Sequence, residues 1–493
     1  MKRTHLLLAG IFMLVFGVRL FLAYSLGQYS YDAYEHIRQI EHIRDTGVHL
    51  VNDPLSYGGR TVVVLPFFHY LLGFLSMVLP LDFVLTFFPN LFASTVVFIG
   101  FALVLRWTKN ELAALFGAFV TGFTPLFFSE TLVSVSPFSL FVPLSFLLFY
   151  SFMQLHRKRF LLMFIILSFI LPLVSIYSLV IVMAFLIYLL FAQIEDFKFK
   201  GRSRELTLFF SFLSFWIILL MFKKPLLQYG PRFVSAAVPD FARHDYFFNV
   251  GFLQLFGGFG ILSLIAGTYI IYISLFERND RRAYLLFSFI SAALFFVWIS
   301  ALKSSLGLSL VGLCLSLFSG IYFDRFFQQL TNTKFARYRR MFIGILFALF
   351  ALSSGLVTLL LSFDVPVVQD AELRVLDWAR LNTPRDATIA APVYFGNLIT
   401  AVAQRKNVAD EQYLLAPDAA ERLSNIRSIY FFIQRYSSTT FVINRMYTWG
   451  ADYIYIPFGS DDRVLRNDAA CFELVYNKEI KVYKVLCRPL QVR

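Results

Sequence analysis

Charged residues are scarce in this sequence. Only 15% of its 493 residues are Asp, Glu, Lys or Arg, whereas 58% are hydrophobic and 61 are Phe. Soluble domains carry about 25% charged residues, so this shortage excludes an ordinary soluble protein and indicates a chain that hides most of its surface in lipid. The net charge of +13 comes from basic residues scattered between apolar runs rather than gathered on one face, so we expect no nucleic-acid partner.

Cysteine is scarce as well, with three residues. Cys314 lies within a predicted helix, where packing is its expected role. Cys471 and Cys487 flank a predicted hairpin, residues 472–476 and 480–486, which turns at Glu479 and places the two cysteines opposite each other. A disulfide on an oxidising face and two buried free thiols both fit this pattern.

The first apolar run of membrane-spanning length covers residues 6–26, behind the basic start Met1-Lys2-Arg3. A cleaved signal peptide is the alternative, weakened by the length of the run and by the lack of a small-residue cleavage site. Residues 61–79 are ambiguous. Treating them as a re-entrant or interfacial segment keeps the basic loops 106–109 and 156–159 on the cytoplasmic side, as the positive-inside rule requires.

Residues 160–191 would form one helix about 50 Å long, so we predict two shorter helices separated near Pro172 and Ser175. The remaining predicted spans cover residues 83–105, 112–128, 137–155, 206–222, 251–276, 287–301, 306–323 and 342–361. The total is about eleven transmembrane helices, with the N-terminus inside and the C-terminus outside. Residues 28–82 and 223–249 then form two large external loops.

The composition becomes polar after this helical part, residues 1–363. Residues 364–493 are the size of a domain and contain a helix-like piece, 372–381, and strand-like pieces, 453–457 and 481–486. The predicted fold class is therefore an α-helical polytopic membrane protein with a C-terminal extracytoplasmic α/β domain.

The first polar segment, Tyr31-Asp32-Ala33-Tyr34-Glu35-His36-Ile37-Arg38-Gln39-Ile40, has apolar residues at helical spacing. It predicts a short amphipathic helix at a membrane surface, ended by Gly47. Asp32 has two interpretations. Together with Glu35 it fits a helix capping box, or it is a catalytic carboxylate at the boundary between water and lipid.

The apolar runs contain almost no ionisable residues and show no internal repeat, which disfavours a proton or ion transporter. The ionisable residues instead gather in segments predicted to be external. Carboxylates and cations at the outer mouth of an apolar bundle suit a lipid-borne anionic substrate whose tail stays in the bilayer.

The Asp32 segment, placed after a long apolar helix, resembles the first external loop of polyprenyl-phosphate-dependent glycosyltransferases of the GT-C class. It is most similar to the catalytic subunit of archaeal-type oligosaccharyltransferases. Residues 375–387, Gly396 and residues 403–410 extend the resemblance into the C-terminal part. The resemblance implies that Asp32 is the catalytic carboxylate and that Tyr31, Glu35 and His36 belong to the active-site loop.

The chain departs from the family at several motifs. Pro392-Val393-Tyr394-Phe395-Gly396 stands where the family has Trp-Trp-Asp-Tyr-Gly, so Tyr394 is the residue offered to the acceptor. The acidic pair of the second loop is missing, and only Glu130 is acidic there. A divalent metal, Mn or Mg, would thus be held by Asp32 with Asp240 and Asp245.

Basic residues are predicted to meet the phosphates of the donor. Lys303 falls where the family keeps such a residue, although an ordinary loop lysine is the alternative, and Arg232 and Arg243 are further candidates. The predicted activity is transfer of a sugar or glycan from a polyprenyl phosphate or diphosphate to an acceptor, at the extracytoplasmic face of the plasma membrane. A non-catalytic homologue that binds or flips a lipid-linked glycan is the alternative, and a transporter is the third.

Overall fold

A computed structural model describes residues 2–197, 203–233, 238, 243, 247–248, 250–435 and 439–487 of the chain, without the side chains of Lys2, Phe252, Leu253 and Phe335. The chain divides into two compact units. The first, here called the membrane unit, comprises Met1–Gly27, Leu65–Phe222 and His244–Val365. The second, the polar unit, comprises Gln28–Val64, Lys223–Arg243 and Pro366–Arg493.

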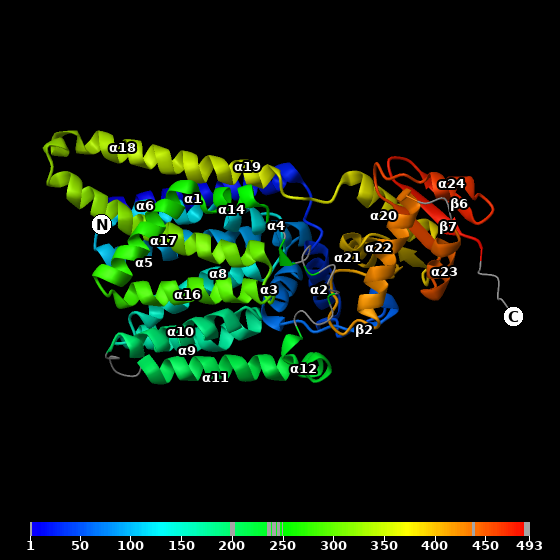
Figure 1. The fold of residues 1–493 in the computed structure, drawn as a ribbon, viewed down its shortest axis with the longest axis horizontal. Coiled ribbons are helices and arrows are strands. Elements are labelled where there is room, and N and C mark those ends of the chain that lie inside the picture. The colour runs from blue at the N-terminus through cyan, green and yellow to red at the C-terminus, as the bar shows by residue number, and fades with distance from the viewer. Residues whose placement is uncertain are drawn as a thin grey trace. The chain divides into compact units, whose positions relative to one another are not determined.

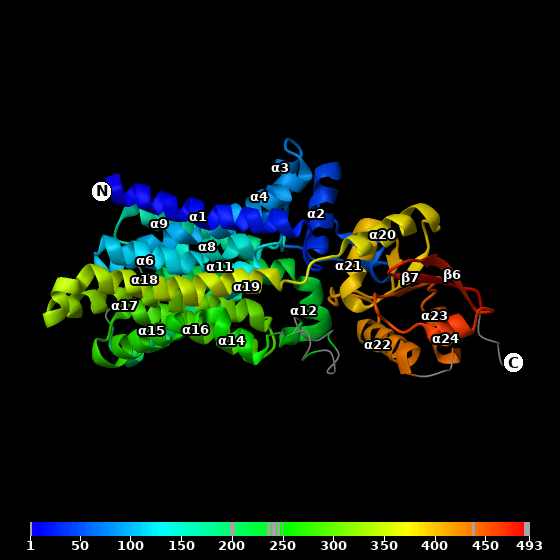
Figure 2. The same ribbon diagram turned by 90° about the horizontal axis from the view of Figure 1, so that it is seen from above.

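The described part of the membrane unit is helical, and its long helices run roughly parallel in both views (Figures 1 and 2). Its elements are α1 (Lys2–Leu26), α3 (Pro66–Ser76), α4 (Leu81–Ser94), α5 (Val96–Thr108), α6 (Glu111–Gly122), α7 (Pro125–Glu130), α8 (Phe138–Phe152), α9 (Lys158–Val174), α10 (Ser178–Ile194), α11 (Ser203–Met221), α14 (Phe252–Phe259), α15 (Ile261–Tyr272), η3 (Ile273–Glu277), α16 (Arg281–Trp298), α17 (Ser304–Thr331), η4 (Lys334–Tyr338), α18 (Arg339–Phe350), η5 (Ala351–Leu356) and α19 (Val357–Phe363).

Six helical stretches of the described chain are long and apolar enough to cross a membrane: Arg3–Leu26, Leu81–Thr108, Ser203–Met221, Arg281–Trp298, Ser304–Thr331 and Ala336–Phe363. Shorter apolar helices occupy the other predicted spans. The chain is therefore a membrane protein, whereas the total of eleven crossings and their orientation stay predictions. At 11 residues, or about 17 Å, α3 is too short to cross a hydrocarbon core of about 30 Å.

The predicted break between residues 160 and 191 is confirmed. Helix α9 ends at Val174, Ser175 adopts an extended backbone (φ −154°, ψ 143°), and α10 begins at Ser178. The two helices then lie beside α11 (Figure 1). Pro172 lies inside the last turn of α9, where it removes a backbone donor and favours the end of the helix.

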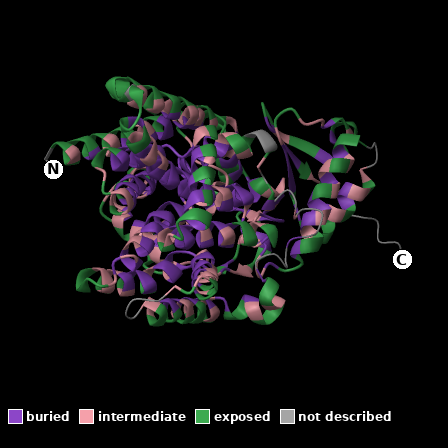
Figure 3. Cartoon of the chain, turned by 60° about the vertical axis from the view of Figure 1, so that its left-hand side comes forward, coloured by how far each residue is buried: buried purple, intermediate pink, exposed green. Residues whose placement is uncertain are grey.

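Large side chains fill the interior of the helix bundle, where buried residues concentrate (Figure 3). Helices α6 and α17 approach closely because both carry glycine at the contact. A Cβ on Gly117 would lie 3.4 Å from the Gly320 Cα and 2.8 Å from a methyl group of Val104, so small residues set the helix spacing. Cys314 of α17 is buried and free, which fits the predicted packing role.

The polar unit contains a five-stranded sheet of order β4-β3-β5-β7-β6, with β3 parallel to β4 and β5, and β7 antiparallel to β5 and β6. The elements of its C-terminal segment are α20 (Asp370–Asn382), β3 (Thr388–Ala390), η6 (Val393–Phe395), α21 (Gly396–Leu398), η7 (Ile399–Ala403), β4 (Lys406–Asn407), α22 (Ala419–Arg435), α23 (Thr440–Thr448), β5 (Tyr453–Ile456), α24 (Arg463–Asn467), β6 (Phe472–Asn477) and β7 (Lys481–Val485).

Two earlier segments of the chain complete the polar unit. The first contributes α2 (Ala33–Thr46), η1 (Ser56–Gly58) and a two-stranded hairpin of β1 (Asn52–Asp53) and β2 (Arg60–Thr61), and the second contributes α12 (Lys223–Tyr229) and η2 (Gly230–Arg232). The predicted helix and strands of the C-terminal part are confirmed. Cys471 and Cys487 form a disulfide across the ends of β6 and β7, so of the two alternatives left by the sequence the bridged one is correct.

Candidate active site

Asp32 lies exposed directly before α2. Its backbone is helical (φ −64°, ψ −28°) and its side chain makes no capping hydrogen bond. The predicted capping box with Glu35 is therefore wrong, because a capping side chain is directed at the first backbone N–H groups by an extended backbone. The predicted end of the helix is correct, since Gly47 takes a left-handed conformation (φ 79°) and its N–H bonds the Ile43 carbonyl.

Helix α2 is amphipathic, as predicted, but its apolar face does not meet lipid. Tyr34, Ile37, Ile40 and Ile43 are buried, and the helix packs on α21 and η7 of the same unit. The helix is therefore a fixed part of the polar unit, and this packing determines where Asp32 emerges.

The residues around Asp32 are held by a pairing of two distant segments. The Val368 N–H donates to the Tyr29 carbonyl at 3.0 Å, and Ser30 forms a β-bridge with Val367. One carboxylate oxygen of Glu372 then accepts hydrogen bonds from the Tyr31 hydroxyl (2.7 Å) and from the Gln369 N–H (2.9 Å). The start of α2 is thus tied to the start of α20.

Tyr31 and Tyr394, both predicted site residues, are in contact. Their ring centroids lie 5.2 Å apart at an interplanar angle of 89°, an edge-to-face arrangement favoured by aromatic quadrupoles. Tyr394 is 39% exposed. Burial, together with Glu372, raises the pKa of both tyrosines, so both hydroxyls stay protonated at neutral pH. The Tyr31 proton is donated to Glu372.

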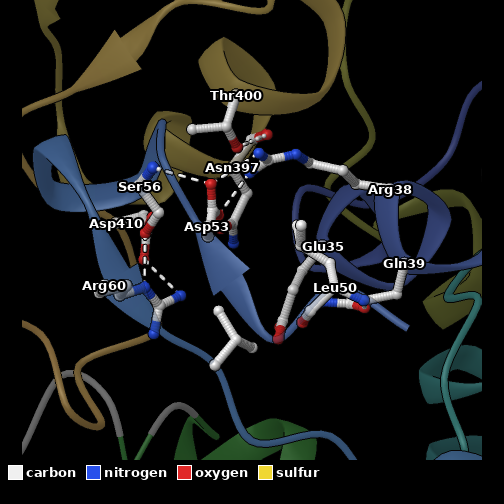
Figure 4. A pocket seen from close by; sticks show the side chains of 11 residues that line it. Glu35, Arg38, Gln39, Leu50, Asp53, Ser56, Arg60, Asn397, Thr400 and Asp410 are labelled. Atoms are coloured by element: carbon white, nitrogen blue, oxygen red, sulfur yellow. Dashed lines mark hydrogen bonds and ion pairs between the residues drawn. The ribbon is translucent and has the colours of Figure 1, made fainter. Parts of the chain in front are cut away.

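A partly buried ion pair connects α2 to β1 (Figure 4). Arg38 donates to both oxygens of Asp53, at 2.6 and 2.7 Å, and the Leu55 N–H adds a third hydrogen bond at 2.8 Å. Burial alone would raise the pKa of Asp53, but these donors and the Arg38 charge hold the pKa below its ordinary value. The bidentate pair fixes α2 to the β1–β2 hairpin.

Asp410 is the centre of a second network, which is buried and lines one pocket together with Arg38 and Asp53 (Figure 4). Its carboxylate accepts hydrogen bonds from Ser56 Oγ (2.7 Å), Asn407 Nδ2 (2.8 Å) and the Gln412 N–H (2.8 Å), and Arg60 lies 3.8 Å away. Gln412 also donates to Glu35, so the predicted active-site residue Glu35 is engaged in a contact that holds α2 in place.

Close packing around Gly396 explains why residues 392–396 end in glycine, the position at which they agree with the family motif. A Cβ at Gly396 would lie 2.2 Å from the Ala409 carbonyl oxygen and 2.6 Å from the Asp410 Cβ, so no larger residue fits. Asn407 Nδ2 also donates to the Gly396 carbonyl at 2.9 Å. Arg405, in the stretch 403–410 that also resembles the family, donates to the Arg380 and Thr383 carbonyls at the end of α20. Both motif residues therefore have a structural role.

The other predicted site residues are dispersed. His36 is half-buried in α2, Arg232 is exposed at the end of η2, and Arg243 is half-buried in the polar unit. Lys303 precedes α17 in the membrane unit and is half-buried. Glu130 ends α7. Asp240 and Asp245 lie outside the described residues.

No group of three or more His, Cys, Asp or Glu side chains that could hold a metal ion occurs among the residues that the structure describes. Of the three predicted ligands, only Asp32 is described. Since a hard divalent cation needs several oxygen ligands, the described residues by themselves do not fit a Mn or Mg site.

Arg19 is a candidate functional residue that the sequence patterns did not single out. The apolar runs were expected to hold almost no ionisable residues, yet α1 carries a fully buried arginine. The signal was present, because an arginine inside a run of spanning length is costly and marks a functional position by default.

Comparisons with known proteins give a consistent fold. No protein-family model and no curated protein matches the chain. Among solved structures, it is similar to the oligosaccharyltransferase of Archaeoglobus fulgidus tethered with an acceptor peptide containing the NVT sequon, at 15% identity over 90% of this chain and 69% of that chain, with a TM-score of 0.63. The same archaeal enzyme in complex with an inhibitory peptide and a dolichol-phosphate matches over the same shares, at 15% identity and a TM-score of 0.62.

A second similar structure has nearly the same length as this chain. ArnT from Cupriavidus metallidurans bound to undecaprenyl phosphate is 12% identical over 99% of both chains, with a TM-score of 0.59. At these identities the likeness concerns the fold. The chain has the fold of the GT-C glycosyltransferases, as its resemblance to the oligosaccharyltransferase subunit predicted.

Proposed function

We propose that this protein is a membrane glycosyltransferase that moves a sugar or glycan from a polyprenyl phosphate or diphosphate to an acceptor at the extracytoplasmic face of the plasma membrane. The observation that carries the proposal is an exposed carboxylate, Asp32, placed before α2 without a capping role, in a chain whose whole length follows the GT-C fold. The structural neighbours bound to dolichol-phosphate and undecaprenyl phosphate support a polyprenyl-linked donor.

In this proposal Asp32 acts as the general base or orients the acceptor nucleophile. Tyr394 offers a hydroxyl to the acceptor, and the Tyr31 and Tyr394 rings offer aromatic surface. Lys303, with Arg232 or Arg243, neutralises the charge that develops on the leaving phosphate. Glu35 keeps α2 in position through Gln412, and His36 stays in the proposed active-site loop.

A divalent cation, Mn or Mg, stays part of the proposal only through Asp32 with Asp240 and Asp245, and the roles above are independent of it. Exhaustive chelation tests it. Loss of transfer that returns with added Mn or Mg supports a metal requirement, and full activity after chelation contradicts it.

The experiment that tests the function uses the purified full-length chain in lipid nanodiscs. Polyprenyl phosphate carrying a radiolabelled sugar is added with a mixture of membrane lipids and surface glycans as acceptors. Transfer of label to an acceptor, with release of the polyprenyl phosphate, supports the proposal. Binding of the donor without any transfer would instead favour the non-catalytic homologue that binds or flips a lipid-linked glycan.

A further inference from the structure

Among the described residues, Arg19 has the largest charged side chain that is fully buried. It lies in α1, seven residues before the helix ends at Leu26, or about 10 Å along the helix axis. The guanidinium Cζ lies 4.1 Å from the centre of the Phe128 ring and 5.5 Å from that of Phe127. A cation inside an apolar bundle is costly unless an anion or a set of acceptors compensates it.

The protein holds only one end of this guanidinium. Nη1 donates to Thr131 Oγ1 at 3.1 Å and approaches Asn90 Oδ1 at 3.5 Å. Both partners are fixed themselves: Thr131 donates to the Phe127 carbonyl at 2.6 Å, and the Asn90 amide donates to the carbonyls of Thr86 and Leu132. These contacts orient the guanidinium plane.

The other edge has no partner. Nε and Nη2 are buried without a hydrogen bond, and Arg19 forms no ion pair in the part of the chain that the structure describes. Nε–H and the neighbouring Nη2–H point in parallel, and this pair of donors is the edge of arginine that binds two oxygens of a phosphate or carboxylate at once.

We infer that the Nε–Nη2 edge of Arg19 is a binding site for a lipid-borne phosphate, the phosphate group of a polyprenyl phosphate. The inference rests on the proposed function and adds to it a phosphate contact within the membrane unit. In the bound state the phosphate oxygens accept hydrogen bonds from the two unpaired N–H groups, and the negative charge of the phosphate compensates the positive charge of the guanidinium.

A structural arginine and a phosphate-binding arginine respond oppositely to substitution. Replacing Arg19 by Met removes an uncompensated buried charge, so the melting temperature of the ligand-free protein should stay the same or rise. Its affinity for undecaprenyl phosphate should fall about tenfold to hundredfold, since two charge-assisted hydrogen bonds are lost. R19K keeps the charge without the two-donor edge and should bind about tenfold more weakly than the parent.

Arg282 provides the matched control in the same unit. Its Nε and Nη2 both donate to Asp280 at 3.1 Å, and its guanidinium lies 5.1 Å from the Trp107 ring centre. Because this edge is already occupied, R282Q should bind undecaprenyl phosphate with the parent affinity.

The experiment measures binding to the full-length protein in phosphatidylcholine nanodiscs with three probes: undecaprenyl phosphate, phosphatidylglycerol and inorganic phosphate. Tight binding of undecaprenyl phosphate alone, lost in R19M and R19K, supports the inference. R19M that melts at a lower temperature but binds with unchanged affinity overturns it, and the proposed function then stands without it. Should R19M fail to fold, unchanged binding by R19K overturns it equally. Binding of phosphatidylglycerol or inorganic phosphate that depends on Arg19, without binding of undecaprenyl phosphate, contradicts both the inference and the proposed function.

Discussion

The Tyr31 hydroxyl donates a 2.7 Å hydrogen bond to Glu372, a residue 341 positions further along the chain. Glu372 also completes the capping box of α20 through the Gln369 N–H. The residue next to Asp32 is therefore held by the helix that opens the C-terminal segment. This contact fixes the backbone that carries the proposed catalytic carboxylate, while the carboxylate itself stays exposed.

Asp32→Asn should abolish most transfer without removing a helix cap. A general base contributes about 10²- to 10⁴-fold to a rate, and the substitution removes no helix cap because the Asp32 side chain does not cap α2. For the same reason, Asp32→Ala should not show the decrease of roughly 1 kcal/mol in stability that follows the loss of a helix cap. Asp45→Asn is the matched control, an exposed carboxylate at the other end of α2. Transfer by the Asp32→Asn variant at the parent rate would refute the catalytic role.

The acceptor should not be an Asn-x-Ser/Thr site. A pocket built to bond a hydroxyl discriminates strongly against analogues that lack it, but Pro392, Val393 and Tyr394 replace the Trp-Trp-Asp part of the signature. Two peptides, one with Asn-Ala-Thr and one with Asn-Ala-Ala, are offered together with the lipid-linked donor. We expect no preference between them and better transfer to a hydroxyl-bearing lipid-linked sugar. Strong transfer to the first peptide alone would contradict this.

Gly396→Ala should destabilise the polar unit by about 1–3 kcal/mol, as overpacking of a filled interior does. The added Cβ meets backbone at 2.2 Å, and backbone moves only by disturbing the Asp410 network. Gly344→Ala is the control, since a Cβ there meets nothing within 4 Å. Thermal unfolding, followed by tryptophan fluorescence, compares the two variants. Equal melting temperatures would show that the backbone around Gly396 adjusts to the added methyl group.

Acid should weaken the polar unit through Asp462. Its carboxylate accepts hydrogen bonds from Lys481 (2.7 Å), Tyr483 (2.6 Å) and Arg466 (2.9 Å). Burial opposes ionisation, yet these donors lower the pKa from 3.8 to about 2. Because the folded-state pKa lies below the unfolded one, the stabilisation is complete above about pH 4 and is lost as the pH falls toward 2.

Asp462→Asn should therefore lower the free energy of unfolding by about 2 kcal/mol at neutral pH. It should also make that free energy less dependent on pH in the acid range. Asp461→Asn changes a neighbouring carboxylate that pairs with the exposed Arg463, and its profile should match that of the parent. If the Asp462 and Asp461 variants unfold alike in acid, the buried network does not control this transition.

Alkylation should count one free thiol in the unreduced, denatured protein and three after reduction, since Cys314 is free and Cys471 is bonded to Cys487. A disulfide that closes a loop of about 15 residues contributes about 3 kcal/mol, so Cys471→Ser should lower stability by that order. Cys314→Ala keeps the bridge, and its stability should respond to reductant as that of the parent does. Three labelled thiols before reduction would contradict the bridge.

Local patterns predicted the elements of this fold well. The division of residues 160–191 followed from length and Pro172, and the β6–β7 hairpin followed from alternation between two cysteines. The site was less accessible to prediction. Ser56 and Arg60 gave no signal, because Asp410, the residue that joins them in a network, lies about 350 positions away. Arg19 was hidden by the average hydropathy of the run around it.

The assignment of roles also changed with the structure. Asp32 and Glu35 matched a capping box by spacing alone, but the helical backbone at Asp32 directs the carboxylate elsewhere. The apolar stripe of α2 predicted a lipid contact, and its actual partners, α21 and η7, come from the far end of the chain. The spacing of apolar residues identifies a helix face that must be buried. Whether lipid or another part of the protein buries that face depends on tertiary contacts.

The composition of the polar unit from segments at both ends of the chain has a consequence for biosynthesis. Ser56 and its hydrogen-bond partner Asp410 are 354 positions apart. At about 5–20 residues per second, roughly 20–70 s of translation separate their appearance. During that time the chain's helices are already being inserted into the membrane. The groups of residues 28–64 that contact residues 366–493 in the folded protein have no partner yet. The ribosome, rather than the membrane, therefore determines the earliest moment at which α2 and its carboxylate reach their working position.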